Sequence, residues 1–157
     1  MIACMTSRLQ PSFDAVAFFA ADHADAVDGK VYVNGGFWNK LSYPQYPAVV
    51  ATMSLVAVIR IPFHEYQEDH RFLLGMVDAD GNALPLKVEG QFRVGASPDL
   101  RRGDPTLMPL AIPVNGLRIE TPGDYSFTLS VDGTELARYQ VRAIQIATPL
   151  RFEIEDG

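Results

Sequence analysis

A strictly alternating stretch toward the end of the chain constrains the fold more than any other feature. Between Thr121 and Gly133, apolar side chains occupy every second position of one run, at Tyr125, Phe127, Leu129 and Val131. Side chains along a strand point alternately to opposite faces, so this spacing predicts a strand with one apolar and one polar face. Asp132-Gly133 predicts a tight hairpin turn, followed by a returning strand over 135–141. Such a strand buries its apolar face against a second layer, which predicts a β-sandwich.

Strand signals recur along the rest of the chain, separated by turn-forming residues. They predict further strands over 13–21, 30–33, 48–61, 71–77, 86–94, 107–114 and 143–154. The apolar run over 48–61 is also compatible with a buried helix, but its β-branched residues favour a central strand. Pro109 and Pro113 interrupt the strand over 107–114, which is typical of a sheet edge. We therefore predict an all-β, antiparallel β-sandwich of about eight strands.

The domain organisation follows from the same pattern. Residues 1–12 lack periodicity and contain Pro11, so we expect a flexible leader there, with either Met1 or Met5 as the natural start. Residues 13–157 are expected to form a single domain, and 157 residues can bury a core without disulfides or metals.

Composition excludes several classes of function. The net charge of −6 argues against nucleic acid or an anionic membrane as a partner, because either would require a basic face. Cys4 is the one cysteine of the chain, so neither an intrachain disulfide nor a thiolate zinc cluster can form. The apolar run over 15–21 is too short to span a membrane. We expect a soluble, cytoplasmic protein.

The Pro122-Gly123-x-Tyr125 pattern and the alternation after it resemble the last hairpin of immunoglobulin-like sandwiches. In those domains a tyrosine near the penultimate strand donates its hydroxyl to the backbone a few residues upstream, and Tyr125 matches that position. Phe127 stands where antibody domains carry a cysteine, and Trp38 comes too early to be their core tryptophan. The resemblance therefore implies an immunoglobulin-like sandwich outside the antibody type.

Over about residues 13–142, the chain is also similar to an uncharacterised bacterial family of unknown function. The matching segments are Asp28-Gly29-Lys30-Val31-Tyr32-Val33-Asn34-Gly35-Gly36-Phe37-Trp38, His70-Arg71-Phe72 with Val77-Asp78-Ala79-Asp80-Gly81, and Pro122-Gly123-Asp124-Tyr125. This resemblance implies the fold and brings no activity, substrate or site with it.

An alternative hypothesis places a metal in the loop that precedes the strand over 71–77. A zinc protease requires His-Glu-x-x-His on a helix, whereas the two histidines of this loop stand six residues apart. A loop can still fold both rings around a metal together with acidic neighbours, which gives a small metal-dependent hydrolase. Its ligands would be His64, Glu65, Asp69 and His70. The same residues are typical of a solvated connecting loop, which we prefer.

Other motifs have ordinary structural explanations. Asp78-Ala-Asp-Gly-Asn82 imitates part of a calcium loop but lacks the glycine at its sixth position, so we interpret it as a turn. No serine lies in a nucleophile-elbow context, and Cys4 lies in the predicted leader. The sequence therefore predicts no catalytic residue and no cofactor.

The aromatic segment from Tyr32 to Pro47 is the best candidate for binding. Large rigid rings among amide side chains suit a partner protein, a peptide or a sugar. The candidate residues are Tyr32, Asn34, Phe37, Trp38, Tyr43 and Tyr46. The competing interpretation is that these rings close the open end of the sandwich. We predict a non-enzymatic binding or protein-interaction module, with self-association possible through an edge strand and no small-molecule ligand identified. Carbohydrate recognition by Trp38, Tyr43 and Tyr46 is a further alternative.

Overall fold

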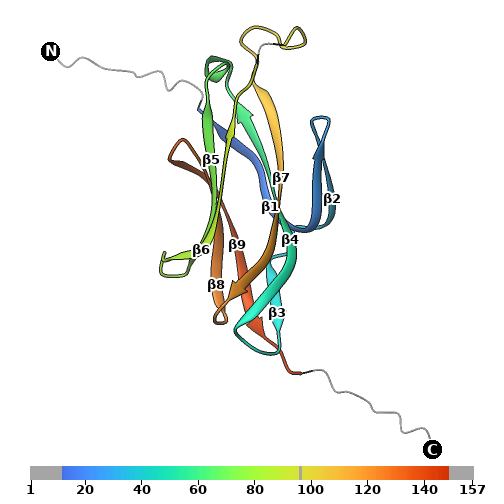
Figure 1. The fold of residues 1–157 in the computed structure, drawn as a ribbon, viewed down its shortest axis with the longest axis vertical. Coiled ribbons are helices and arrows are strands. Elements are labelled where there is room, and N and C mark those ends of the chain that lie inside the picture. The colour runs from blue at the N-terminus through green and yellow to red at the C-terminus, as the bar shows by residue number, and fades with distance from the viewer. Residues whose placement is uncertain (1–11, 96, 149–157) are drawn as a thin grey trace, which may run out of the picture.

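The computed structural model describes residues 12–95 and 97–148, and these residues form two packed β-sheets (Figure 1). One turn of 3-10 helix, η1, spans Phe63–Glu65, and no α-helix occurs among the described residues. None of their helices is long and apolar enough to cross a membrane. The nine strands are β1 (Asp14–Val27), β2 (Lys30–Gly36), β3 (Lys40–Tyr43), β4 (Ala48–Ile61), β5 (His70–Asp78), β6 (Ala83–Phe92), β7 (Thr106–Ile119), β8 (Gly123–Val131) and β9 (Thr134–Gln145).

The strand order confirms the predicted β-sandwich. One sheet has the order β2-β1-β4-β7 and the other has the order β3-β9-β8-β5-β6. All neighbouring strands are antiparallel except β3 and β9, which run parallel to each other. The long strand β4 lies between β1 and β7, so the run over 48–61 is a strand rather than a helix. β7 lies at a sheet edge, as its prolines predict.

The core lies between the two sheets. The four apolar side chains of the alternating run in β8 are all buried, and Phe127 is fully inaccessible to solvent. Alternate residues of β4, including Leu55, Ile59 and Ile61, meet them from the other sheet. The period-two pattern was therefore sufficient to predict which face of β8 is buried, because a one-residue slip would reverse every side chain.

Several element boundaries differ from the prediction. β1 extends to Val27, because its second half pairs with β2 to form a long hairpin. The aromatic segment expected to be a loop contains the short strand β3, which adds to the edge of the second sheet. β9 ends at Gln145, so the strand predicted over 143–154 does not continue through residues 146–148, and its residues 149–154 lie outside the described residues. The predicted leader likewise lies outside them, apart from Ser12.

The β1–β2 hairpin provides a second, smaller apolar cluster. Its turn uses positive φ angles at Asp28 and Gly29, 52° and 73°, as a two-residue hairpin loop requires. The cluster consists of buried residues of β1 and β4, and Val31 of β2 packs against it. Its members are Phe19, Ala21, Ala24 and Val56. The hairpin is therefore anchored to the sheet by apolar contacts as well as by backbone hydrogen bonds.

Candidate functional site

The aromatic candidates do not form one surface, because the structure divides them between solvent and core. Tyr32 on β2 and Phe37 directly after it are 57% and 69% exposed. Asn34 is also exposed on β2, where it pairs in register with His23 of β1. Trp38, Tyr43 and Tyr46 are half-buried and pack against the core.

The three half-buried rings are fixed in place by their surroundings. The Tyr46 hydroxyl donates to the carbonyl of Ile144 at 2.7 Å, which ties the segment to the end of β9. The Tyr139 hydroxyl donates to the carbonyl of Trp38 at 2.8 Å. Tyr43 meets Tyr46 edge to face, with 6.3 Å between ring centroids. These half-buried rings pack at the edge of the second sheet, where β3 pairs with β9, and expose only part of their surface.

Phe37 is held in an unusual conformation for an exposed aromatic residue. Its φ is 65°, in the left-handed region that residues with a side chain rarely adopt. Its backbone N–H donates to the carbonyl of Ala20 at 2.9 Å. Its ring stacks on that of Phe19, with centroids 4.0 Å apart and planes 17° apart. The backbone and the stacking together fix the direction in which this ring faces solvent.

Val33, which is 38% exposed, lies at Gly36 near the buried Phe19 ring on which Phe37 stacks. A Cβ placed on Gly36 would lie 2.8 Å from the Val33 side chain and 3.3 Å from the Phe19 ring, so the two side chains meet over this glycine. Only glycine leaves room for that contact. We call Phe19, Val33 and Phe37 the hairpin patch.

A second distinctive feature is a buried histidine at the beginning of β5. His70 and Ser54 are the polar side chains that are buried among the described residues, and the His70 side chain is only 3% exposed. Its Nδ1 lies 2.7 Å from Oδ2 of Asp132, in the turn between β8 and β9. Its Nε2 lies 2.8 Å from the backbone carbonyl of Glu65.

Both nitrogens of His70 face groups that accept hydrogen bonds. A carboxylate and a carbonyl each favour a proton on the nitrogen that faces them, so this geometry favours the doubly protonated, positively charged ring. Burial lowers the pKa of His70, but the bonds to Glu65 and Asp132 and the attraction of their carboxylates outweigh it and raise the pKa above its ordinary 6.5. Burial raises the pKa of Asp132, but its bonds from Arg71 and His70 lower it below 3.8 overall.

The His70 ring contacts Phe13, Phe92 and Asp132, which lie in three separate parts of the chain. The rings of Phe13 and Phe92 pack against it, with centroids 4.7 and 5.4 Å away and planes inclined by 72° and 35°. The other carboxylate oxygen of Asp132 accepts the backbone N–H of Arg71 at 2.9 Å. The Asp132 carboxylate therefore clamps the β8–β9 turn to the beginning of β5.

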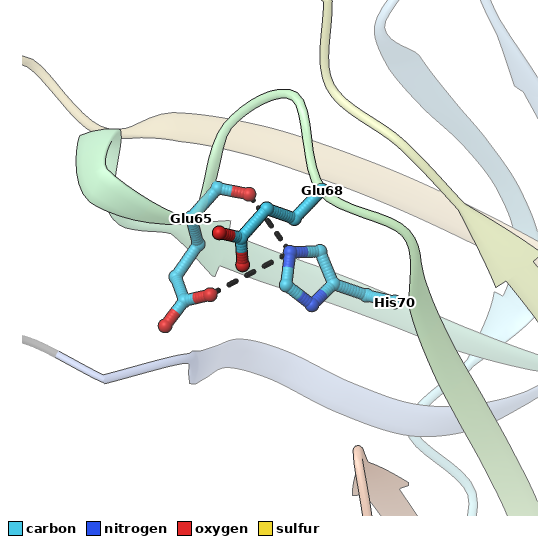
Figure 2. A group of neighbouring side chains, drawn as sticks. All are labelled: Glu65, Glu68 and His70. Carbon is cyan, nitrogen blue, oxygen red and sulfur yellow. Dashed lines mark hydrogen bonds and ion pairs between the residues drawn. The ribbon is translucent and has the colours of Figure 1, made fainter.

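The residues proposed as metal ligands are only partly brought together. Figure 2 shows the group whose ligand atoms all lie within 4.8 Å of one another: Glu65, Glu68 and His70. Of the four candidates, Asp69 instead lies 3.7 Å from Arg93 in an exposed ion pair. Nε2 of His64 lies 3.5 Å from Oε1 of Glu65, at the margin of this group.

The hydrogen bonds of His70 argue against a metal at this group. A metal ligand must offer a lone pair from neutral imidazole, whereas the acceptors that face both nitrogens of His70 favour the protonated ring. Glu65 and Glu68 then act as negative charges near a buried positive one, which compensates its loss of hydration. The sequence favoured a solvated connecting loop here. In the structure, this loop covers the buried ring of His70, whose positive charge the geometry favours.

Two surface hollows flank the η1 turn. They have volumes of about 320 and 380 Å³ and share Phe63 and His64 in their walls. Arg60 lines the first hollow, but its guanidinium is already 3.1 Å from Asp14. The described residues around these hollows show no nucleophile hydrogen-bonded to a base, which is the arrangement that covalent catalysis requires.

The residue order and the strand pattern place the chain in a known family. A family of unknown function, DUF6941, matches residues 16–144. The chain belongs to this family. The DUF6941 match spans β1 to β9 and so covers both sheets, which bears out the similarity to a family of unknown function. No curated protein matches the chain.

Sequence reasoning missed several residues that now stand out. Asp132 was recognised only as a turn former, and Glu68 was passed over between two other acids. Phe19 and Val33 were assigned to strands without a role. Of these, only Asp132 carried a usable signal, since an aspartate at a hairpin turn can reach the backbone of a neighbouring strand.

Proposed function

We propose that this member of the DUF6941 family is a non-enzymatic interaction module that contacts a partner protein through the hairpin patch. The observation that carries this proposal is Phe37, which is 69% exposed although its φ is 65° and its ring is stacked on Phe19. A strained backbone at an exposed ring costs on the order of 1–3 kcal/mol and persists where the surrounding structure, often for function, fixes it. Exposed aromatic anchors of fixed direction dominate the energetics of protein interfaces.

We further propose that the sandwich is of the immunoglobulin-like type. If β1, β4 and β7 are strands A, B and E, and β5, β6, β8 and β9 are C, C′, F and G, the order within each sheet agrees with that fold. The Tyr125 hydroxyl donates to the carbonyl of Thr121 at 2.6 Å, which is the bond that the resemblance implied. Domains of this type carry many unrelated functions, so the argument for binding rests on the hairpin patch and not on the fold.

The test compares partners recovered from the source cell with wild type, Phe37→Ala and Phe63→Ala. Phe63 is the matched control, since it is also an exposed phenylalanine but lies on η1. We expect a partner recovered with wild type and Phe63→Ala to be depleted about tenfold or more with Phe37→Ala, the loss typical of an interface anchor. Equal recovery with all three proteins would overturn the proposal. A thermal unfolding curve for each variant confirms that the fold is intact.

A further inference from the structure

The outer edge of β6 is an unpaired row of backbone groups. β6 ends the second sheet, with β5 as its neighbour on the other side. The Asp132 N–H donates to the carbonyl of Arg71, so Arg71 faces β8 and the next residue of β5, Phe72, faces β6. Phe72 pairs with Gly90. Because backbone groups alternate along a strand, Lys87 and Glu89 direct their N–H and C=O groups outward, where another strand can pair with them.

The other edge strands are less suited to pairing. On β7, Pro109 and Pro113 pair with Val58 and Ser54 of β4, and neither has an N–H to offer to a further strand. β3 is only four residues long. β2 ends in two glycines, Gly35 and Gly36, which pack poorly against a neighbouring strand. Chains commonly protect edges with prolines, lysines and short strands. β6 carries Pro85 near its beginning, which offers no N–H at the outer edge, but the strand has no proline from Leu86 to Phe92.

The exposed charges of β6 identify the strand that fits this edge. Lys87 and Glu89 lie on its solvent face, 3.0 Å apart and two residues apart. An antiparallel second copy of β6, related by a two-fold axis at Val88, places each Lys87 opposite a Glu89. Both members of that pair direct their backbone groups toward the other strand, so they exchange two hydrogen bonds. A register centred on Glu89 would instead place two glutamates opposite each other.

A second copy would also bury more of the inner face of β6. Its inward side chains, including Leu86 and Val88, pack against the core but are only half-buried. Across the gap between the sheets, Leu110 and Ile112 of β7 are half-buried as well. In the two-fold register each Val88 meets its symmetry mate in a non-hydrogen-bonded pair, where side chains approach most closely. We infer that the chain forms a two-fold dimer through antiparallel β6 strands, with Lys87 of each copy opposite Glu89 of the other.

Sedimentation velocity over a range of subunit concentrations tests this dimer. We expect wild type to dimerise, and Glu89→Lys and Lys87→Glu each to raise the dissociation constant about tenfold or more, because each puts like charges at two symmetric positions. The double variant Lys87→Glu, Glu89→Lys restores opposite charges in the same register and should regain wild-type association. The matched control is Glu120→Lys, which disrupts a similar exposed pair with Arg118, two residues away on β7, and should leave the dimer unchanged.

A backbone variant provides an independent measurement. Glu89→Pro removes an outward N–H while leaving the hydrogen bonds between β5 and β6, so it should abolish the dimer and retain the circular dichroism of a folded β protein. A wild-type protein that stays monomeric at millimolar concentration would overturn the inference. The inferred dimer would also be refuted if Glu120→Lys weakened association as much as Glu89→Lys, or if the charge-swapped double variant stayed monomeric. None of these results depends on the hairpin patch, so this inference and the proposed function can fail separately.

Discussion

The pair of His70 and Asp132 makes a pH-dependent contribution to stability whose direction follows from the geometry. The folded pKa of His70 lies above 6.5, so its stabilisation is fully present below about pH 6.5 and is lost as pH rises through the folded pKa. The folded pKa of Asp132 lies below 3.8, so its contribution is present above about pH 3.8 and is lost as pH falls through the folded pKa. The pair therefore stabilises the fold most between these limits.

Asp132→Asn isolates this contribution. The asparagine oxygen can still accept the N–H of Arg71, and asparagine tolerates the φ of 48° at this position. Its amide group, however, places a donor against Nδ1 of His70 and favours the neutral ring. One hydrogen bond between charged groups is lost, and such bonds contribute roughly 1.5–3 kcal/mol. Because the Asp132 side chain is 45% exposed, solvent screens the pair. We expect a loss near the lower end of that range, about 1.5–2 kcal/mol at pH 6.

The assay is urea unfolding followed by the fluorescence of Trp38, the one tryptophan of the chain, from pH 5.5 to 8.5. We expect the unfolding free energy of wild type to fall with rising pH by at most about 1.4 kcal/mol per unit, the limit for one proton. Asp132→Asn should show a flatter profile and a melting temperature lower by about 3–8 °C at pH 6.

Asp25→Asn is the matched control, because it disrupts another histidine–aspartate pair, with His23, whose side chains are 60% and 63% exposed. An exposed pair contributes little, so its unfolding free energy should stay within about 0.5 kcal/mol of wild type. A wild-type stability that rises between pH 6 and 8, or an Asp132→Asn profile as steep as that of wild type, would refute the assignment of a charged, clamped His70.

Two further predictions concern stability. Tyr125→Phe removes the hydroxyl that donates to the carbonyl of Thr121, and it should lower the unfolding free energy by about 1 kcal/mol, whereas the exposed Tyr32→Phe should have no effect in the same urea titration. Gly90→Ala would place a methyl group against the ring of Phe72, and it should destabilise the chain by about 1–3 kcal/mol; a wild-type unfolding midpoint would show that the ring can move aside.

The fold could be predicted largely because its dominant signals are local. The alternation in β8 fixes which side chains are buried, and Asp132-Gly133 fixes the turn that follows. Pro109 and Pro113 mark β7 as an edge strand, because a missing N–H is tolerated only there. These features depend on the residue itself or its near neighbours.

The features that could not be predicted depend on contacts between distant residues. β3 is only four residues long and acquires strand geometry by pairing with β9, about a hundred residues later in the chain. Its own residues carry no alternation strong enough to show this. The second half of β1 is polar and irregular, and it becomes a strand because β2 folds back on it. Tertiary pairing, rather than local propensity, decides both segments.

The candidate site likewise combines features that the sequence indicates locally with features that depend on distant contacts. The sequence drew attention to the aromatic segment, but not to which of its rings would be exposed. Phe37 and Trp38 are adjacent, yet one faces solvent and the other packs against the core. Adjacent residues of an extended chain point to opposite sides, but the sequence does not indicate which of these two rings lies on the solvent side. His70 and Asp132 are 62 residues apart, so no spacing in the sequence could indicate that they form a partly buried ion pair.

The buried polar groups of the described residues differ in how far the fold satisfies them. Both nitrogens of the buried His70 have hydrogen-bond partners within the protein. The one buried side-chain donor without a partner among the described residues is the indole N–H of Trp38. It lies in the segment that also presents Phe37, the most exposed large apolar side chain of the described residues. Because the indole nitrogen is buried, a bound partner cannot reach it, so the case for association at this segment rests on Phe37, whose exposed ring a partner can cover.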